Sequence, residues 1–314
     1  MITKSATNVN KCTYPYVFTK NARTAWSKII QLEVEQRAKN IKLLLPSYIG
    51  INDKEGSGVF DAVENNGVEF DFYNVTESLQ VDIDDCSRQL QTGEFDLLLI
   101  IHYFGFSRID MGKIKKMCDE NNVVLVEDCA HAFYLDESAL SIGSYGDYSF
   151  YSLHKYLPVN SGGLLRINSL STLKPHLNAE EKIESSVIEQ FSISNFNEIE
   201  KIRRRNYRHY INKLAKISEI DIMFECFDSD VPQTFPIRVK KEQREKLYYY
   251  LLERDIHTIS LYYRLIPQIS ASKFPLSKQI SSEILNLPVH QDTEIHDINV
   301  ICDAIVDFFG KCDA

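Results

Sequence analysis

The side chains that best combine for catalysis lie within residues 123–168. An acidic pair, Glu127 and Asp128, follows the apolar run VVLV, which is typical of a strand buried on both faces. A second strand, rich in aromatic residues, follows and leads into Ser152 and Lys155 in the order SLHK. Because ligands of open α/β sheets bind at the carboxyl ends of strands, we expect the acid, the serine and the lysine to meet at one edge of a sheet.

This set of side chains suits one cofactor in particular. Lys155 lies between an aromatic strand and the apolar residues YLP, and burial there would lower the pKa of its amine and free it for Schiff-base chemistry. Pyridoxal 5'-phosphate (PLP) needs a lysine for its aldehyde, a carboxylate for its pyridine nitrogen and a hydroxyl to help hold its phosphate. Lys155, Asp128 and Ser152 therefore predict a PLP site.

The same stretch resembles the DegT/DnrJ/EryC1/StrS family, the PLP-dependent nucleotide-sugar aminotransferases of aspartate-aminotransferase fold. The resemblance rests on EDCAHA, GSYGD and SLHKYLPVNSGGLL in that order, and on ILNLPVH near the C-terminus. It implies that Asp128 is the partner of the pyridinium, that His131 contacts the cofactor near its ring hydroxyl, and that Lys155 is the Schiff-base lysine. Gly162 and Gly163 match the diglycine of the family.

The elements that position these residues are expected to form an α/β fold. The resemblance implies the PLP-dependent transferase fold type I: a large domain, residues 1–200, with a mainly parallel seven-stranded sheet, and a small C-terminal α/β domain, residues 201–314. Apolar runs and periodic patterns support this organisation. They predict strands at 42–45, 68–73, 97–101, 148–153, 164–167 and 235–239, and helices at 23–37, 59–65, 111–120, 202–217, 242–254 and 294–309.

The start of the first predicted helix is expected to hold the phosphate. Backbone N–H groups of Ala22, Arg23 and Thr24 would bind an anion at this helix end, together with the Arg23 guanidinium and the Ser152 hydroxyl. The family has a Ser-Gly-Thr turn at this place, so this chain matches the family here in position but not in residue type. A basic residue that merely opens a surface helix is the alternative.

The strand at 42–45 ends in PSYIG, similar to PSYTF in the family. The family aromatic that stacks on the cofactor ring falls at Gly50 in this chain. Tyr48 is a candidate for the ring contact, with plain packing as the alternative. The segment that reaches the neighbouring subunit in the family is also missing. A divergent member with lost or rerouted activity, in a binding or structural role or in other PLP chemistry on sugars, therefore stays open.

Two further features are assigned to structure rather than to chemistry. His102 follows the strand at 97–101 and is expected to be a satisfied histidine that lines the top of the sheet. Arg203, Arg204 and Arg205 resemble the family's entry into the small domain. Neighbouring residues on a helix diverge by about 100°, so these three cannot face one ligand, and we expect a solvated interdomain helix.

Other enzyme classes are less well supported. A Rossmann dehydrogenase would need a GxGxxG motif after its first strand, and none is present. A metal hydrolase lacks HxxxH or CxxC spacing, and no metal is expected, although such a site could be assembled from His102, Asp128, Cys129, His131 and His154. Asp128 and His131 could also form a buried pair that only stabilises the sheet.

Composition places the chain among soluble proteins. Of 314 residues 44% are hydrophobic and 25% charged, which is ordinary for a globular protein. The net charge of −9 argues against nucleic-acid binding. Seven cysteines without CxxC pairs indicate reduced thiols in a cytoplasmic protein, and the longest apolar run is too short to span a membrane.

The resemblance also implies partners. It implies a homodimer that takes an amino group from an amino acid, usually L-glutamate, and gives it to a keto-sugar carried on a nucleotide. The products would serve deoxyamino-sugar and polysaccharide biosynthesis, such as that of lipopolysaccharide O-antigen.

Overall fold

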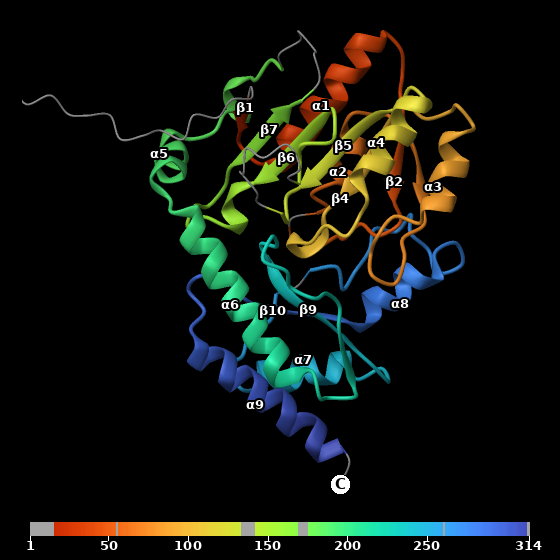
Figure 1. Ribbon diagram of the computed structural model, residues 1–314. Coiled ribbons are helices and arrows are strands. Elements are labelled where there is room, and N and C mark those ends of the chain that lie inside the picture. The colour runs from red at the N-terminus through yellow and green to blue at the C-terminus, as the bar shows by residue number, and fades with distance from the viewer. Residues whose placement is uncertain (1–15, 55, 133–141, 169–174, 260, 313–314) are drawn as a thin grey trace, which may run out of the picture.

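Two β-sheets organise the chain, one large and one small (Figure 1). The computed structural model describes residues 16–54, 56–132, 142–168, 175–259 and 261–312. The expected α/β fold, with a mainly parallel seven-stranded sheet and a smaller C-terminal α/β part, is confirmed.

The large sheet has the strand order β1-β7-β6-β5-β4-β2-β3. Strand β7 runs antiparallel to both neighbours, and the other pairs are parallel. Strand β4, which pairs with β5 and β2, is buried along its whole length, as its apolar sequence predicts. The strands are β1 (Tyr16–Thr19), β2 (Lys42–Pro46), β3 (Glu69–Tyr73), β4 (Leu97–Ile101), β5 (Val124–Cys129), β6 (Tyr148–Ser152) and β7 (Gly163–Ile167).

Helices pack around this sheet. Helix α1 begins where the Asn21 side chain accepts a hydrogen bond from the Thr24 N–H, and it buries Trp26, Ile29 and Ile30. Asp110 caps α4 by accepting a hydrogen bond from the Lys113 N–H. The helices are α1 (Ala22–Arg37), α2 (Phe60–Asn65), α3 (Ile83–Leu90) and α4 (Met111–Glu120), with short 3-10 helices at Tyr103–Gly105, Leu153–Lys155 and Ala179–Glu181.

The C-terminal part is built on an antiparallel sheet of order β10-β9-β8. Figure 1 shows α6 running from the large sheet towards the small one, with α9 beside it. The expected domain boundary at residue 200 falls within α6. The elements are α5 (Ser185–Ile193), α6 (Phe196–Leu214), β8 (Ile220–Ile222), β9 (Thr234–Val239), α7 (Arg244–Leu252), α8 (Pro275–Glu283), β10 (Ile284–Pro288) and α9 (Ile295–Cys312).

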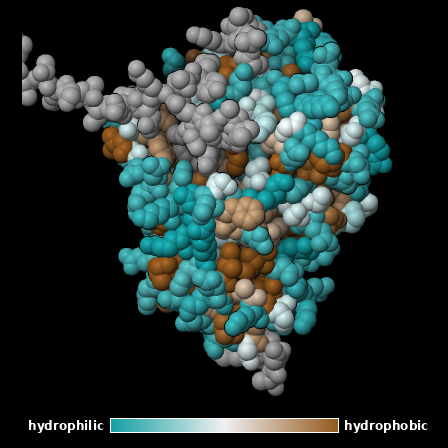
Figure 2. Space-filling view, viewed as in Figure 1, coloured by the Kyte–Doolittle hydropathy of each residue, from teal (hydrophilic) through white to brown (hydrophobic). Residues whose placement is uncertain are grey.

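Some element bounds differ from the sequence prediction. Helix α6 starts six residues earlier than expected, because Asn195 caps it by accepting the Glu198 N–H at 3.2 Å. Helix α8 was not predicted, although Pro275 at its first turn is a helix-start signal. The visible surface is largely hydrophilic, with hydrophobic groups gathered over the small domain (Figure 2). Within the described residues, none of the helices has the length and hydrophobicity of a membrane span.

Candidate active site

A cavity of about 590 Å³ opens at the carboxyl ends of β5 and β6. It brings together six of the eight residues predicted to form the site, whereas Thr24 and Tyr48 do not line it. The six are Ala22, Arg23, Asp128, His131, Ser152 and Lys155.

Strand β6 carries Ser152 and Lys155 to the cavity. Ser152 is the last residue of the strand, and the chain then turns through the 3-10 helix Leu153–Lys155. The turn is fixed because the Leu153 N–H donates to the Gly162 carbonyl at 2.9 Å. The Ser152 hydroxyl is buried and lies 3.1 Å from His154 Nδ1.

The diglycine explains how α1 reaches the same place. Gly163 pairs with Ser152 on one side and with Thr19 on the other. A Cβ on Gly163 would collide with the backbone of Asn21, the residue that caps α1. Only glycine therefore allows the start of α1 to lie this close to Ser152.

Asp128 is a buried carboxylate with little to neutralise it. Its side chain is aimed into the cavity from the end of β5, and within the described residues it accepts one hydrogen bond, from the Ala130 N–H at 2.8 Å. Burial raises its pKa to about 6, against the opposing effects of the Ala130 N–H and of the Lys155 charge. A cation placed against Asp128 would remove this penalty.

His131 lines the same cavity and has a buried nitrogen without a hydrogen-bond partner among the described residues. The residue is 5% exposed, and this nitrogen is its Nδ1. Its carbonyl accepts a hydrogen bond from the Tyr156 hydroxyl at 2.6 Å, which ties it to the segment of Lys155. Burial, followed by the Lys155 charge, lowers the pKa of His131 well below 6.5. The imidazole is therefore neutral and can donate one hydrogen bond and accept one.

The buried acid–histidine pair lies one residue away from the place suggested by the sequence. Glu127, not Asp128, has a histidine partner: its Oε2 lies 2.8 Å from His102 Nε2. Three backbone N–H groups, of Gly143, Tyr145 and Gly146, also donate to Glu127. Burial alone would raise the pKa of Glu127, but the hydrogen bonds from His102 and the backbone leave it lowered.

This pair also bears on the metal alternative. Among the described residues, the one grouping with metal-like geometry is His102, Glu127 and Cys129, whose ligand atoms lie within 4.8 Å of one another. Both Glu127 oxygens are already used by the hydrogen bonds given above, so the grouping is explained as a support for β4 and β5. It does not contain Asp128 or His131. His102 has its predicted place at the top of the sheet, but its Nδ1 has no hydrogen-bond partner among the described residues, so it is only partly satisfied.

The N-terminus of α1 is only partly available to an anion. The Thr24 N–H donates to Asn21 Oδ1 at 2.9 Å, so the Asn21 cap takes one of the three N–H groups expected to bind phosphate. Arg23 lines the cavity and forms an ion pair with Asp61 at 3.3 Å. Ala22 and Arg23 remain at the cavity with Ser152.

Tyr48 lies behind the cavity wall. It is fully buried, does not line the cavity, and stacks on Tyr262 with ring centroids 5.1 Å apart. Tyr262 does line the cavity, and so does Gly50. Tyr262 was not predicted as a site residue, because no sequence motif marks it.

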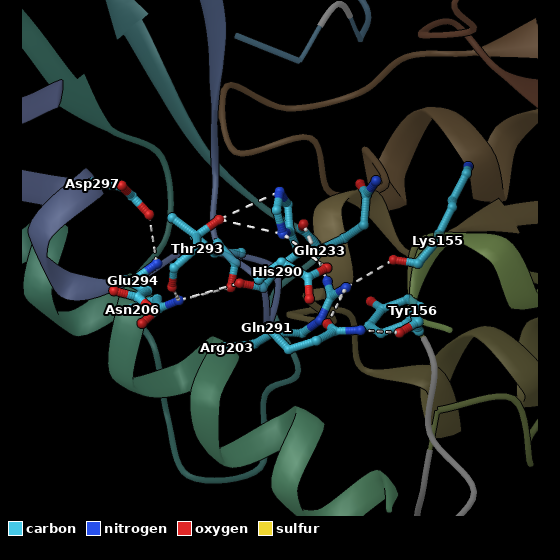
Figure 3. A network of polar contacts seen from close by, with 12 residues as sticks. Lys155, Tyr156, Arg203, Asn206, Gln233, His290, Gln291, Thr293, Glu294 and Asp297 are labelled. Atoms are coloured by element: carbon cyan, nitrogen blue, oxygen red, sulfur yellow. Dashed lines mark hydrogen bonds and ion pairs between the residues drawn. The ribbon is translucent and has the colours of Figure 1, made fainter. Parts of the chain in front are cut away.

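Arg203 corrects a second expectation. We expected a solvated helix for Arg203, Arg204 and Arg205, but Arg203 is only 1% exposed. Its guanidinium donates to the Lys155 carbonyl at 2.9 Å and to Gln291 Oε1 at 3.2 Å, and it lies 4.3 Å from the Tyr156 ring. Figure 3 shows that the Lys155 side chain points away from this network. Arg203 therefore fixes the backbone of the lysine segment against the small domain.

Comparison with known proteins assigns the family. The sequence profile of the DegT/DnrJ/EryC1/StrS aminotransferase family matches residues 57–174 and 183–306. The chain belongs to this family. It is 24% identical over 244 residues to dTDP-3-amino-3,6-dideoxy-alpha-D-galactopyranose transaminase of Aneurinibacillus thermoaerophilus, covering 68% of this chain and 66% of that protein. It is also 30% identical over 95 residues to GDP-perosamine synthase of Vibrio cholerae, covering 30% of this chain and 25% of that protein.

Solved structures agree on the fold. A putative sugar aminotransferase from Streptococcus pneumoniae in its PMP form has a TM-score of 0.78 at 12% identity, covering 96% of this chain and 89% of that one. DesV of S. venezuelae has a TM-score of 0.76 at 17% identity, covering 95% and 85%. The matched region spans just under two thirds of the first curated relative and a quarter of the second.

The cavity fits the cofactor that the family implies. PLP needs an amine, a carboxylate for its ring nitrogen and a donor for its ring oxygen. Lys155, the under-neutralised Asp128 and the unpartnered Nδ1 of His131 offer these three groups in one cavity. Ser152 and the start of α1 lie at the edge of this cavity, where they would bind a phosphate.

Proposed function

We propose that this protein is a PLP-dependent aminotransferase that moves an amino group from an amino acid, with L-glutamate as the donor, to a keto-sugar carried on a nucleotide. The observation that carries the proposal is the meeting of Lys155, Asp128 and His131 in one cavity, with a charge penalty on Asp128 and an unpartnered nitrogen on His131. The substrate class is supported by the relatives, two of which are named as synthases or transaminases of nucleotide-linked amino sugars.

Each residue has a distinct task in this proposal. PLP supplies an electron sink that makes the Cα–H bond of an amino acid acidic. Lys155 Nζ would bind PLP covalently, and once released would take the proton from the donor Cα and pass it to the cofactor, moving a proton in the opposite sense when the keto-sugar accepts the amino group. Asp128 would accept a hydrogen bond from the protonated ring nitrogen, and His131 Nδ1 would bind the ring oxygen. Ser152 and Arg23, with the N–H groups at the start of α1, would hold the phosphate.

Hydrogen bonds to the backbone hold the segment that carries Lys155. Arg203 holds its carbonyl, and the Tyr156 hydroxyl joins its segment to the carbonyl of His131. The backbones that carry Lys155 and His131 are thus held relative to each other before any ligand binds. Such preorganisation is what a proton transfer at a defined atom requires.

The cellular setting follows from the same assignment. We infer a cytoplasmic enzyme in deoxyamino-sugar biosynthesis, such as that of O-antigen polysaccharides, since GDP-perosamine synthases are among its relatives. We further infer a homodimer. This inference rests on the family to which the chain belongs.

Amino transfer to a panel of nucleotide-linked keto-sugars, with glutamate as donor, tests this function. Lys155→Ala should abolish product formation measured by mass spectrometry, because it removes the amine that binds PLP and carries the proton. Lys116→Ala, on the exposed face of α4, is the matched control and should leave the rate unchanged. Amino transfer that persists in Lys155→Ala at the wild-type rate would refute the assignment.

A further inference from the structure

Gly50 lies against an aromatic ring that comes from the small domain. A Cβ added to Gly50 would lie 3.0 Å from Cδ1 and 3.4 Å from Cε1 of Tyr262. Gly50 is not among the glycines with positive φ, so its backbone does not demand glycine. The Tyr262 ring thus fills the space that a side chain at position 50 would need.

The backbone around Tyr262 is built to hold the ring there. Tyr262 has φ of 59°, a left-handed conformation that is costly for a residue other than glycine and is found mainly where surrounding structure enforces it. Gly50 pairs with Leu265 in an isolated antiparallel bridge, and the Ser281 hydroxyl donates to the Tyr262 carbonyl at 2.8 Å. The contact between Gly50 and Tyr262 is therefore fixed from both sides.

The ring of Tyr262 faces the groups assigned to the cofactor. Tyr262 lines the cavity together with Asp128, His131 and Lys155. It meets the His131 ring edge to face, with centroids 5.5 Å apart and an interplanar angle of 79°. Burial, followed by the Asp128 charge, raises the pKa of Tyr262 well above 10. The phenol is therefore neutral beside the position of the ring nitrogen.

Tyr48 supports this arrangement from behind. Its ring is stacked on Tyr262 at an interplanar angle of 17°, and Tyr103 packs edge-on against both rings. The Tyr103 hydroxyl donates to the Tyr48 carbonyl at 2.6 Å. Three tyrosines thus form a rigid aromatic block, of which Tyr262 is the member that lines the cavity.

We propose that Tyr262 is the aromatic wall of the cofactor pocket and that it replaces a ring at position 50. This inference rests on the proposed function. It makes the small domain a direct part of the cofactor site, because the loop of Tyr262 lies after β9 and α7 in the sequence. The cofactor ring would lie between the end of β5 and this loop.

A double-mutant cycle between the two positions tests the proposal. The dissociation constant of PLP is measured from the absorbance and fluorescence of the bound cofactor for the wild type, Tyr262→Ala, Gly50→Phe and the double variant. Each single change should weaken PLP binding about tenfold, the first by loss of an aromatic contact and the second by collision of two rings. The double variant should recover to within about threefold of the wild type, since the new ring takes the vacated space.

Control variants distinguish loss of the aromatic ring from loss of folding. Tyr262→Phe keeps the ring and should retain wild-type affinity, and Tyr263→Ala removes a neighbouring ring that does not line the cavity and should do the same. Tyr262→Leu keeps bulk without a ring and should weaken binding, and it replaces Tyr262→Ala if that variant does not fold. Thermal unfolding without PLP shows which variants are folded.

The outcomes distinguish this inference from the function on which it rests. If the wild type binds PLP on Lys155 while Tyr262→Ala or Tyr262→Leu binds it equally well, the role of Tyr262 is wrong and the aminotransferase assignment stands. Purely additive losses in the double variant would also overturn it. If the wild type forms no adduct with PLP, the proposed function falls, and this inference falls with it.

Discussion

Replacing Asp128 by asparagine should stabilise the protein without cofactor while it damages PLP binding. Asp128 is 3% exposed and its pKa is raised from 3.8 to about 6, mainly by burial. At about 1.4 kcal/mol per pKa unit, the ionised carboxylate costs the folded state about 3 kcal/mol. Asparagine keeps an oxygen for the Ala130 N–H but carries no charge, so the free energy of unfolding should rise by up to that amount.

The pH dependence of this gain has a definite sign. Because the folded pKa lies above the unfolded one, the cost is fully present above pH 6. It shrinks as the pH falls through 6 and disappears below 3.8, where Asp128 is protonated in both states. Asp128→Asn should therefore exceed the wild type by about 3 kcal/mol at pH 8 and match it near pH 4.

Urea unfolding at a series of pH values, in the absence of PLP, measures this difference. Asp84→Asn, on the exposed side of α3, is the control and should change stability little at any pH. Saturating PLP should then raise the unfolding temperature of the wild type more than that of Asp128→Asn, because the neutral amide cannot pair with a charged ring nitrogen. A gain that is absent, or equal at pH 4 and pH 8, would refute the reasoning.

Three other substitutions test the supports of the site. Gly163→Ala should lower the free energy of unfolding by about 1–3 kcal/mol, because the new Cβ meets the start of α1. The control Gly310→Ala has open space around it and should be neutral or stabilising. Equal effects of the two substitutions would contradict the close approach of α1 to Gly163. Glu127→Gln should lower the free energy of unfolding by about 2–4 kcal/mol at pH 7. Because hydrogen bonds lower the pKa of Glu127, the difference in stability between variant and wild type should fade below pH 4.5. A difference that persists at lower pH would argue against an ionised Glu127. Arg203→Met should cost about 2–4 kcal/mol in urea unfolding, since the Lys155 carbonyl and others lose their donor, and an unchanged midpoint would show that Arg203 is dispensable.

The sequence predicted the parts of the site that strands deliver. Asp128 lies at the end of β5 and Lys155 just after β6, and the carboxyl ends of such parallel strands meet at one edge of the sheet whatever the details of packing. Apolar runs are enough to locate those strands. The antiparallel strand β1 and helix α8 were missed because their apolar signals are short.

Contacts between distant segments could not be predicted in the same way. Arg203 and its two neighbours are chemically identical, and only the rotation of α6 decides which one is buried. Tyr262 meets Gly50 across more than 200 residues through a left-handed turn, which no local pattern encodes. Glu127 and Asp128 point to opposite faces of β5, and only the position of His102 in the fold decides that Glu127 has the histidine partner.

The central claim is that Lys155, facing Asp128 and His131, binds PLP. The most direct measurement is reduction of the protein with borohydride after incubation with PLP, followed by digestion and mass spectrometry of the modified peptide. The account predicts one stoichiometric pyridoxyl adduct on Lys155, and none at that site in Lys155→Ala. Adducts spread over exposed lysines with Lys155 unmodified would contradict it.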